Sequence, residues 1–336
     1  MNAVVIEGPG KIDVGEVPDP RPGPEDVVIA VNACGICGTD LHVADGEFAL
    51  AKYPLVPGHE FAGEVVDAGS QVKGIAVGAK VTADPNQPCG RCRPCREGHA
   101  NLCDDFRALG ITVAGACADY VAVPYWLART LPEGFDMSIG ALIEPLSCAV
   151  HAYDLVRTRL GDRFLIYGAG TMGLMLVALA QRVGAVSVAV VEPHLKRRQL
   201  AGSLGASAVF ASSAELGDER FTIVIDASGV VQVIEDAMAR VQRGGTYLQF
   251  GVAPAEATAR FSPFRLYNDE TNYVGSMAVL HSFDRARDLA VELDLGLSKL
   301  VTDTYPLSDY ASALEQMRTG SGLKVQVVSE AQIDAK

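Results

Sequence analysis

Hydrophobic and polar residues alternate from Met1 to about Leu131, in short runs that turn-forming residues separate. Alternation with a period of two places successive side chains on opposite faces of a strand, so each run predicts a half-buried β-strand. The runs are VVIEG, EDVVIAV, EFAGEVVDAG, AKVTA and ADYVAVP, with the proline-rich PDPRPGP between the first two. The pattern therefore predicts a β-rich first domain that ends near Leu131.

The pattern changes at Gly161, where apolar strands begin to alternate with helices. The expected strands are RFLIY, SVAVVE, FTIVIDAS and GGTYLQFG, and the expected helices are TMGLMLVALAQRV, LKRRQLAGSL and VQVIEDAMARV. Strands that alternate with helices predict a parallel sheet with both faces covered. This second part is predicted to be a doubly wound α/β domain.

The segment after Tyr273 has recognisable elements but no clear domain. It predicts one more strand, a helix around Ser282 to Leu293, the run TDTYPL, an amphipathic helix at ALEQM and the strand LKVQVV. A length of 336 residues favours about two domains in all. Periodicity shows which face of an element is buried and not which element covers it, so this tail could belong to either domain.

One uncharged stretch, FLIYGAGTMGLMLVALA from Phe164 to Ala180, raises the question of a membrane span. It is short for a bilayer, and glycines interrupt its first half. A strand, a glycine turn and a buried helix explain the stretch better.

The glycine turn in that stretch has the pattern G-x-G-x-x-G. It follows a predicted strand and opens a predicted helix, which is the context of a dinucleotide-binding loop. Such a loop brings backbone N–H groups and a helix N-terminus to a pyrophosphate. The candidate cofactor-binding residues of the loop are Gly168, Gly170, Thr171, Met172 and Gly173. The alternative is a glycine-rich turn that only joins a strand to a helix.

An acidic residue follows the loop at the distance that the dinucleotide pattern requires. Glu192 stands nineteen residues after Gly173, at the end of the next predicted strand. A carboxylate there accepts hydrogen bonds from the adenosine ribose and repels a 2′-phosphate, which favours NAD over NADP. Arg197 and Arg198 lie a few residues later and could receive such a phosphate, although arginines on a surface helix are usually solvated.

Four cysteines lie within PCGRCRPCREGHANLC and form the pattern C-x2-C-x2-C-x7-C. Four thiolates so close together complete a tetrahedral site with no open position, which is typical of a structural zinc. An iron–sulfur cluster also takes four cysteines, but the known ferredoxin spacings differ. The residues are Cys89, Cys92, Cys95 and Cys103.

A second set of candidate ligands lies in GICGTDLH, VPGHEFAGEVV and ALIEPLSCAVHA. Cys37, His59 and Glu60 offer sulfur, nitrogen and oxygen, and three protein ligands with one exchangeable position are the composition of a catalytic zinc. Glu144 lies among apolar residues, where a metal would offset the cost of its charge. The alternatives are a core thiol for Cys37, a surface pair for His59 and Glu60, and a helix N-terminal acid for Glu144.

Taken together and in this order, GICGTDLH, PGHEFAGEVV, the four cysteines, IEPLSCAVHA and GAGTMG resemble the zinc-dependent medium-chain dehydrogenases over essentially the whole chain. The resemblance is closest to the polyol, or sorbitol-type, branch, because Glu144 stands where simple alcohol dehydrogenases of the family have a cysteine. It implies a GroES-like catalytic domain over residues 1–145 and 277–336, with a structural-zinc lobe at 88–104. A Rossmann domain for NAD is then expected over 146–276, and the tail returns to the first domain.

The resemblance also implies roles for individual residues. Cys37 and His59 are expected to bind the catalytic zinc, with Glu60 and Glu144 as direct or water-mediated ligands. Thr39 and His42 match the family's proton-relay positions, and the four cysteines match its structural zinc. A capping hydroxyl for Thr39 and a surface imidazole for His42 are the alternatives.

The expected reaction is NAD-linked oxidation of a secondary hydroxyl of a polyol or sugar-like alcohol to the ketone, through a zinc alkoxide and hydride transfer. An aminocyclitol, a vicinal diol or a simple secondary alcohol would use the same chemistry. A zinc-scaffolded nucleotide sensor is the non-enzymatic alternative. The family commonly forms dimers or tetramers through its nucleotide-binding domain.

Net charge and cysteine content limit the partners, the location and the type of cysteine site that the sequence predicts. The net charge of −13 disfavours nucleic acid as a partner, since such binding depends on Lys and Arg. The first residues show no basic segment followed by an apolar one, so no secretory signal is expected and a cytoplasmic location follows. Eight cysteines in a chain of this size favour metal sites over a disulfide framework.

Overall fold

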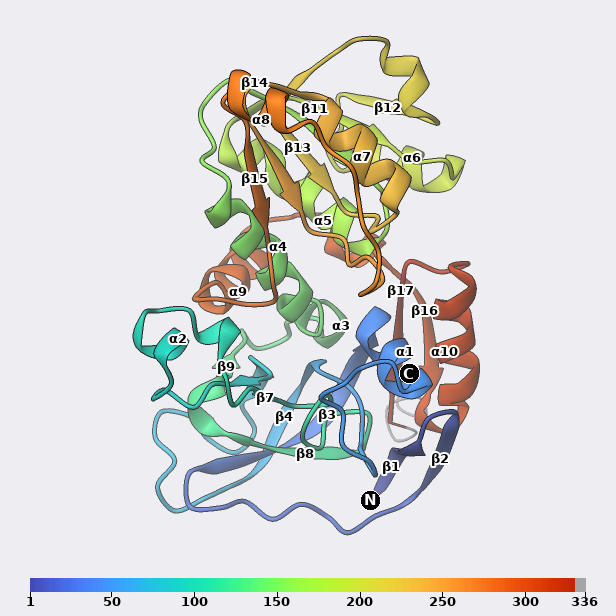
Figure 1. The fold of residues 1–336 in the computed structure, drawn as a ribbon. Coiled ribbons are helices and arrows are strands. Elements are labelled where there is room, and N and C mark those ends of the chain that lie inside the picture. The colour runs from blue at the N-terminus through green and yellow to red at the C-terminus, as the bar shows by residue number, and fades with distance from the viewer. Residues whose placement is uncertain (330–336) are drawn as a thin grey trace. The chain divides into compact units, whose positions relative to one another are not determined.

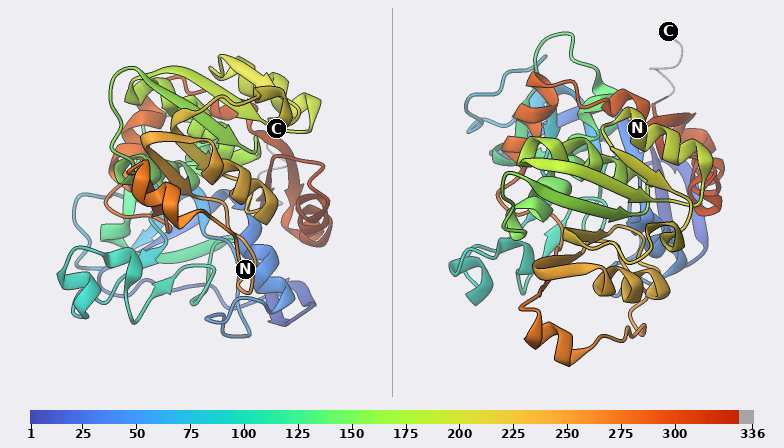
Figure 2. Two further views of the ribbon diagram at one scale, coloured as in Figure 1. Left: turned by 45° about the horizontal axis from the view of Figure 1, so that its top comes forward. Right: turned by 90° about the horizontal axis from the view of Figure 1, so that it is seen from above.

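A computed structural model describes residues 1–329, and the chain divides into two compact units (Figures 1 and 2). The first unit comprises Met1–Ser147 and the described residues from Val279 onward, and the second comprises Cys148–Ala278. The boundaries expected from the sequence, 145/146 and 276/277, lie two residues earlier in each case. Residues 330–336 of the expected catalytic domain lie outside the described part.

The first unit is built on a sheet of seven strands in the order β16-β17-β3-β4-β5-β9, with β8 pairing to β3. The strands are β3 (Asp26–Ile36), β4 (Glu60–Ala68), β5 (Lys80–Ala83), β8 (Tyr120–Pro124), β9 (Ala128–Thr130), β16 (Val301–Pro306) and β17 (Lys324–Val328). Two small sheets accompany it, formed by β1 (Asn2–Gly8) with β2 (Lys11–Glu16) and by β6 (Asn86–Gln87) with β7 (Arg107–Ala108). The β-rich first part predicted from alternation is therefore present.

Short helices join these strands. They are α1 (Gly38–Asp45), α2 (Arg93–Arg96), α3 (Met137–Gly140), α9 (Phe283–Glu292) and α10 (Tyr310–Thr319), with 3₁₀ turns η1 (Ala100–Leu102), η2 (Tyr125–Leu127), η5 (Leu297–Lys299) and η6 (Leu307–Asp309). The longer helix α4 (Ile143–Leu155) contains the point at which the chain passes from the first unit to the second.

The C-terminal strand β17 settles where the tail belongs. It pairs antiparallel with β3, with Val325 opposite Ile36 and Val327 opposite Cys34. Figure 1 shows β17 beside β16 and α10 in the first unit, although β3 and β17 come from nearly opposite ends of the chain. This pairing places Lys324 next to the segment that carries Cys37.

The second unit contains one parallel sheet of six strands in the order β12-β11-β10-β13-β14-β15. The strands are β10 (Asp162–Tyr167), β11 (Ala185–Val191), β12 (Ala208–Phe210), β13 (Phe221–Asp226), β14 (Val241–Gln249) and β15 (Asn272–Gly275). The helices are α5 (Thr171–Ala180), α6 (Leu195–Ser203), α7 (Val231–Ala239) and α8 (Pro263–Asn268), with η3 (Gln181–Val183) and η4 (Ser213–Leu216). Figure 2 shows helices on both faces of this sheet, as predicted for a doubly wound domain.

The central strand β10 explains the uncharged stretch that resembled a membrane span. Phe164, Leu165 and Ile166 are fully buried, because helices cover both faces of the sheet, and the strand carries no polar side chain at these positions. After the glycine turn, α5 continues the apolar pattern for ten residues. No helix among residues 1–329 is long and apolar enough to cross a bilayer.

Candidate active site

The position of Cys37 is fixed by the start of α1. Its Sγ accepts a hydrogen bond from the Thr39 N–H at 3.2 Å, and its own N–H donates to Asp40 Oδ2 at 2.9 Å. This reciprocal arrangement is a capping box with sulfur in place of the usual hydroxyl. The cap therefore fixes the direction in which the sulfur atom points.

His59 lies directly before β4 and points its ring at Cys37. The distance from His59 Nε2 to Cys37 Sγ is 3.1 Å, and the ring is buried. Gly58 makes this approach feasible, because its φ is +97° and a Cβ there would lie 2.6 Å from Cys34 Sγ. Burial lowers the pKa of His59, but the nearby Cys37 thiolate and Asp40 carboxylate outweigh this effect and raise it well above its ordinary value.

The far side of the His59 ring faces Asp40. Asp40 Oδ1 lies 3.8 Å from His59 Nδ1, and neither buried atom has a hydrogen-bond partner within the described chain. A carboxylate behind a ligating imidazole fixes the ring orientation and makes the other nitrogen more basic. The arrangement leaves Nε2 as the nitrogen available beside Cys37.

Glu60, the first residue of β4, is buried against a lysine that the sequence analysis did not single out. Lys324 Nζ lies 2.8 Å and 2.6 Å from the two carboxylate oxygens of Glu60 and donates to the Ile36 carbonyl at 3.2 Å. Burial lowers the pKa of Lys324, but the adjacent Glu60 carboxylate raises it overall. A Cβ on Gly35 would lie 2.2 Å from Glu60 Oε2, so the glycine makes room for the carboxylate.

Glu144 lies beside this group, in the first turn of α4. Ligand atoms of Cys37, His59 and Glu60 all lie within 4.8 Å of one another, and Glu144 is not a member of that group. Burial is the main reason why the pKa of Glu144 is raised to about 7. The charge of His59 lowers this pKa, and the charge of Glu60 raises it. The structure thus brings three of the four predicted ligands together and keeps the fourth in their electrostatic neighbourhood.

This donor set fits zinc. Bond lengths of about 2.3 Å to sulfur and about 2.0 Å to nitrogen place two tetrahedral ligands roughly 3.5 Å apart. The observed separation of Cys37 Sγ and His59 Nε2 is 3.1 Å. A small displacement of either side chain would accommodate the ion, and the carboxylate of Glu60 lies within reach.

The four cysteines of the 88–104 lobe also converge, around α2 and η1. Their sulfur atoms all lie within 4.8 Å of one another, and all eight cysteines of the chain are free thiols. Backbone N–H groups of Arg91 and Cys92 lower the pKa of Cys89 to about 6, whereas burial and the neighbouring sulfurs raise the pKa of Cys95 to about 12. Four cysteine sulfurs this close together fit a fully coordinated zinc.

Thr39 and His42 lie one helical turn apart on α1. His42 is about half exposed, and its Nδ1 lies 2.7 Å from Glu47 Oε2. Residues three apart share a helix face, so the two side chains lie on the same side of α1. The His42 imidazole is at the surface, as its alternative expects. Thr39 takes part in the helix cap through its backbone N–H, and Cys37 is the capping residue, so this contact does not test the capping hydroxyl.

The glycine loop follows β10 as predicted, and each glycine meets a different requirement. Gly168 has φ of +91°, and a Cβ on Gly173 would lie 2.0 Å from the Gly168 carbonyl oxygen. A Cβ on Gly170 would meet no protein atom within 4 Å, so the loop backbone is open on that side. Thr171 begins α5 with a buried hydroxyl that has no partner within residues 1–329, and Met172 follows it. An open backbone and an unpaired hydroxyl at a helix start suit a pyrophosphate.

Glu192 holds the loop in place from the end of β11. Its Oε2 accepts from the Ala169 N–H at 2.8 Å and its Oε1 from the His194 N–H at 2.9 Å. The guanidinium of Arg198 donates to the carbonyl oxygens of Glu192 and Pro193. Arg198 is thus anchored beside Glu192, whereas Arg197, the predicted cofactor residue, is the neighbouring residue on α6.

Comparison with known proteins agrees with this geometry. Residues 23–133 match the alcohol dehydrogenase GroES-like domain, and residues 171–292 match the zinc-binding dehydrogenase domain. The chain is 34% identical to D-arabinitol dehydrogenase 1 of Uromyces fabae over 97% of both chains. It is 30% identical to L-threonine 3-dehydrogenase of Aeromonas hydrophila subsp. hydrophila, over 92% of this chain and 94% of the relative.

A solved structure matches equally well. A chain from Sinorhizobium meliloti 1021, described as a zinc-binding dehydrogenase bound to NADP, superposes with a TM-score of 0.92 at 35% identity. The match covers 97% of this chain and 98% of that one. The protein belongs to the zinc-dependent medium-chain dehydrogenase family. It is an alcohol dehydrogenase that uses zinc and a nicotinamide cofactor, which confirms the predicted family, fold class and enzyme class.

Proposed function

We propose that this enzyme oxidises a secondary hydroxyl of a polyol or sugar-like alcohol to the ketone and transfers the hydride to NAD. The observation that carries the proposal is the group of half-buried Cys37 with buried His59 and Glu60, in the electrostatic neighbourhood of Glu144. A glutamate in place of a third soft ligand is the pattern of the polyol branch, and a D-arabinitol dehydrogenase is among the relatives.

Each residue of the site has a proposed task. Cys37 and His59 would hold the catalytic zinc, with Glu60 and Glu144 as direct or water-mediated ligands. When bound, zinc would act as a Lewis acid and lower the pKa of a substrate hydroxyl. Asp40 would orient the His59 ring, and Lys324 would neutralise Glu60 and hold its carboxylate in position.

The hydroxyl proton must leave the buried site, and we propose that Thr39 and His42 carry it. His42 lies at the surface next to Glu47, where its ring can exchange a proton with water. The shared face of α1 supports the pairing of the two residues.

For the cofactor, we propose NAD held by Gly168, Gly170, Thr171, Met172 and Gly173, with Glu192 and Arg197 at the adenosine ribose. When bound, the nicotinamide accepts a hydride from the carbinol carbon. The buried carboxylate of Glu192 supports NAD, because a 2′-phosphate would meet its charge. Arg198 is the residue that would favour NADP.

A second substrate class has specific support. An L-threonine 3-dehydrogenase is 30% identical over 92% of this chain, and its name implies a hydroxyl next to an amine-bearing carbon. The alternative of an aminocyclitol, a vicinal diol or a simple secondary alcohol therefore stands, and this relative adds an amino alcohol to it, with the same site residues.

A substrate panel tests the proposed function. Turnover to NADH should be fastest with pentitols and hexitols, slower with 2,3-butanediol and L-threonine, and slower again when NADP replaces NAD. Dialysis against a chelator should remove this activity, and added Zn²⁺ should restore it. Unchanged turnover after measured loss of all zinc would contradict the zinc mechanism, and a preference for threonine would select the alternative.

The ion pair of Lys324 and Glu60 gives a prediction about stability. Lys324→Met leaves the buried Glu60 carboxylate without its cation, and we expect a loss of about 3–5 kcal/mol in the free energy of unfolding. Lys80→Met removes the partner of the surface carboxylate Glu64 and should cost less than about 1 kcal/mol. Urea unfolding of the zinc-loaded variants compares the two. Equal losses would show that the buried pair is not required.

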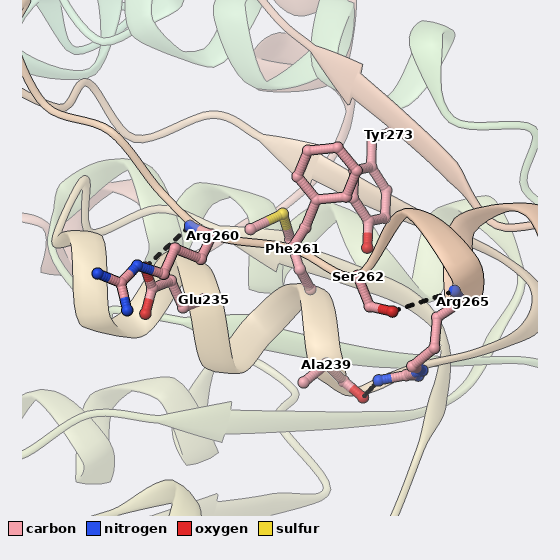
Figure 3. A pocket seen from close by; sticks show the side chains of 8 residues that line it. Glu235, Ala239, Arg260, Phe261, Ser262, Arg265 and Tyr273 are labelled. Carbon is pink, nitrogen blue, oxygen red and sulfur yellow. Dashed lines mark hydrogen bonds between the residues drawn. The ribbon is translucent and has the colours of Figure 1, made fainter.

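We also propose a homodimer formed through β15, the last strand of the parallel sheet. An exposed strand edge invites pairing with a second copy. Figure 3 shows the Phe261 and Tyr273 rings together at a cavity of about 340 Å³ next to α7, and their centroids lie 5.7 Å apart. Phe264 and Tyr267 on α8 are both well exposed, which is unusual for aromatic side chains and favours a contact surface.

Sedimentation analysis tests the dimer. The wild-type chain should sediment as a dimer or a tetramer, and Phe264→Glu with Tyr267→Glu should shift it towards smaller species without loss of helical signal. Leu160, which is 93% exposed elsewhere on this unit, provides the matched control as Leu160→Glu. A wild-type monomer at micromolar concentration would exclude the proposal.

We retain the expected domain boundaries and a cytoplasmic location as proposals. The eight free thiols support the cytoplasmic location.

A further inference from the structure

A second polar cavity lies in the nucleotide-binding unit, at the end of the sheet opposite to the glycine loop. It has a volume of about 510 Å³ and is lined by Asp162, Thr222, Thr246 and Asn272, from β10, β13, β14 and β15. Asp162 is the first residue of β10, whereas the glycine loop follows its last residue, Tyr167. Since a strand advances about 3.3 Å per residue, the two sites lie roughly 17 Å apart along the sheet.

The lining of this cavity is positively charged, in contrast to the chain as a whole. Arg157, Arg159 and Arg243 line it, and Asp162 is its one carboxylate. The chain carries 41 acidic residues against 28 basic ones, so three arginines around one cavity depart from the average. Asp162 is itself largely buried and accepts a hydrogen bond from the Arg159 N–H.

The guanidinium groups of the three arginines are available to bind a ligand in the cavity. Arg157 and Arg159 are exposed, and their side chains have no hydrogen-bond or ion-pair partner within residues 1–329. Arg243 is only loosely held, with Nε 3.6 Å from Asp269 Oδ1 and Nη2 3.3 Å from the Asn268 carbonyl oxygen. Asp269 also pairs with Arg265, so its charge is shared.

The backbone shapes the cavity by an irregularity at the start of β14. The pairing of β13 with β14 shifts register between Phe221 and Ile223, and Gly244 has φ of +71°. A Cβ on Gly245 would lie 2.7 Å from the Thr222 carbonyl oxygen, so the bulge packs directly on β13. Gln242 and Arg243 are carried on this bulge and line the cavity together with Arg157 and Arg159.

We propose that this cavity binds a multivalent oxyanion, such as the phosphate group of a small metabolite, at a site separate from the catalytic centre. Guanidinium groups bind phosphate through paired, charge-assisted hydrogen bonds, and the amides of Gln242 and Asn272 add neutral donors. The volume falls within the range of roughly 300–1,000 Å³ of small-molecule sites. The inference does not depend on which alcohol the enzyme oxidises.

Calorimetric titration with inorganic phosphate tests the proposal, on zinc-loaded protein saturated with NAD so that the glycine loop is filled. Ionic strength is kept constant with chloride. Wild-type protein should bind phosphate saturably, and Arg157→Gln with Arg159→Gln should weaken binding by about tenfold or more. Arg157→Lys should have an intermediate effect, because it keeps the charge but loses the planar fork.

Two further variants make the outcome decisive. Arg182→Gln removes an exposed arginine of the same unit that does not line the cavity, and it should leave binding unchanged. Arg243→Gln changes a different segment of the lining and should weaken binding even if the double variant is unstable. Absence of saturable binding in the wild type, or equal affinity in all variants, would overturn the proposal.

Discussion

Cys37→Ser should lower kcat/KM by a factor on the order of 10³ or more, about 4 kcal/mol of transition-state stabilisation, while the chain remains folded. A serine hydroxyl is not ionised at neutral pH and binds zinc far more weakly than a thiolate. The zinc content should fall from two ions per chain to one. Steady-state kinetics and elemental analysis of the same preparation measure both effects.

Cys34→Ser is the matched control, because Cys34 is buried only three residues away. Its Sγ lies 3.7 Å from Cys117 Sγ and is in neither of the two candidate metal groups among the described residues. This variant should keep both zinc ions and most of its turnover. A Cys37→Ser protein that retains two zinc ions and wild-type turnover would refute the assignment.

Cys89→Ser should act on stability instead of on the chemical step. Removing one of four thiolates opens the lobe at 88–104 and releases its zinc, whose binding energy stabilises the folded lobe. Structural zinc sites contribute on the order of 10 kcal/mol in isolated peptides, so we expect a loss of several kcal/mol here. Thermal unfolding followed by circular dichroism, together with zinc content, measures the effect.

The two cysteine variants should therefore lose different properties, turnover in Cys37→Ser and stability in Cys89→Ser. Protein that survives purification as Cys89→Ser should retain most of its turnover per folded chain, whereas Cys37→Ser should show the loss on the order of 10³ or more in kcat/KM. Equal loss of turnover with intact folding in both variants would contradict the distinction between a catalytic and a structural zinc.

Much of the fold could be predicted because the hydrophobic pattern of each element indicates which of its faces are buried. Strand β10 is an uninterrupted apolar run since helices cover both of its faces. In the first unit, β8 alternates between buried and partly buried residues, whereas β3 and β4 are buried at most positions. The tail could not be placed, because periodicity in LKVQVV says nothing of the pairing with β3. That pairing joins segments from nearly opposite ends of the chain, and only the resemblance to a family anticipated it.

The site was predictable to a similar degree. Residue type and spacing identified Cys37, His59 and the four cysteines of the 88–104 lobe. In the structure, the ligand atoms of Cys37 and His59 lie close together in one group, and the four lobe sulfur atoms lie close together in another. Lys324 was missed because a single lysine in a strand is ordinarily read as a solvent-facing residue. Only the structure shows that the consecutive residues Lys324, Val325 and Gln326 are all buried, which a charged side chain tolerates only with a partner.

Asp40 was also missed, although it stands within the motif GICGTDLH. Cys37 caps a helix whose third residue is Asp40. This short helix places the carboxylate behind His59. A capping box with a cysteine at its start has no ordinary sequence signature, so only the three-dimensional arrangement reveals the pair.

The central claim is that Cys37 and His59 hold a zinc ion, and anomalous scattering at the zinc absorption edge from a crystal of zinc-loaded protein tests it most directly. The account predicts two peaks per chain, one among the four lobe cysteines and one bonded to Cys37 Sγ and His59 Nε2. A peak at the lobe alone, with Cys37 and His59 turned away from each other, would contradict it.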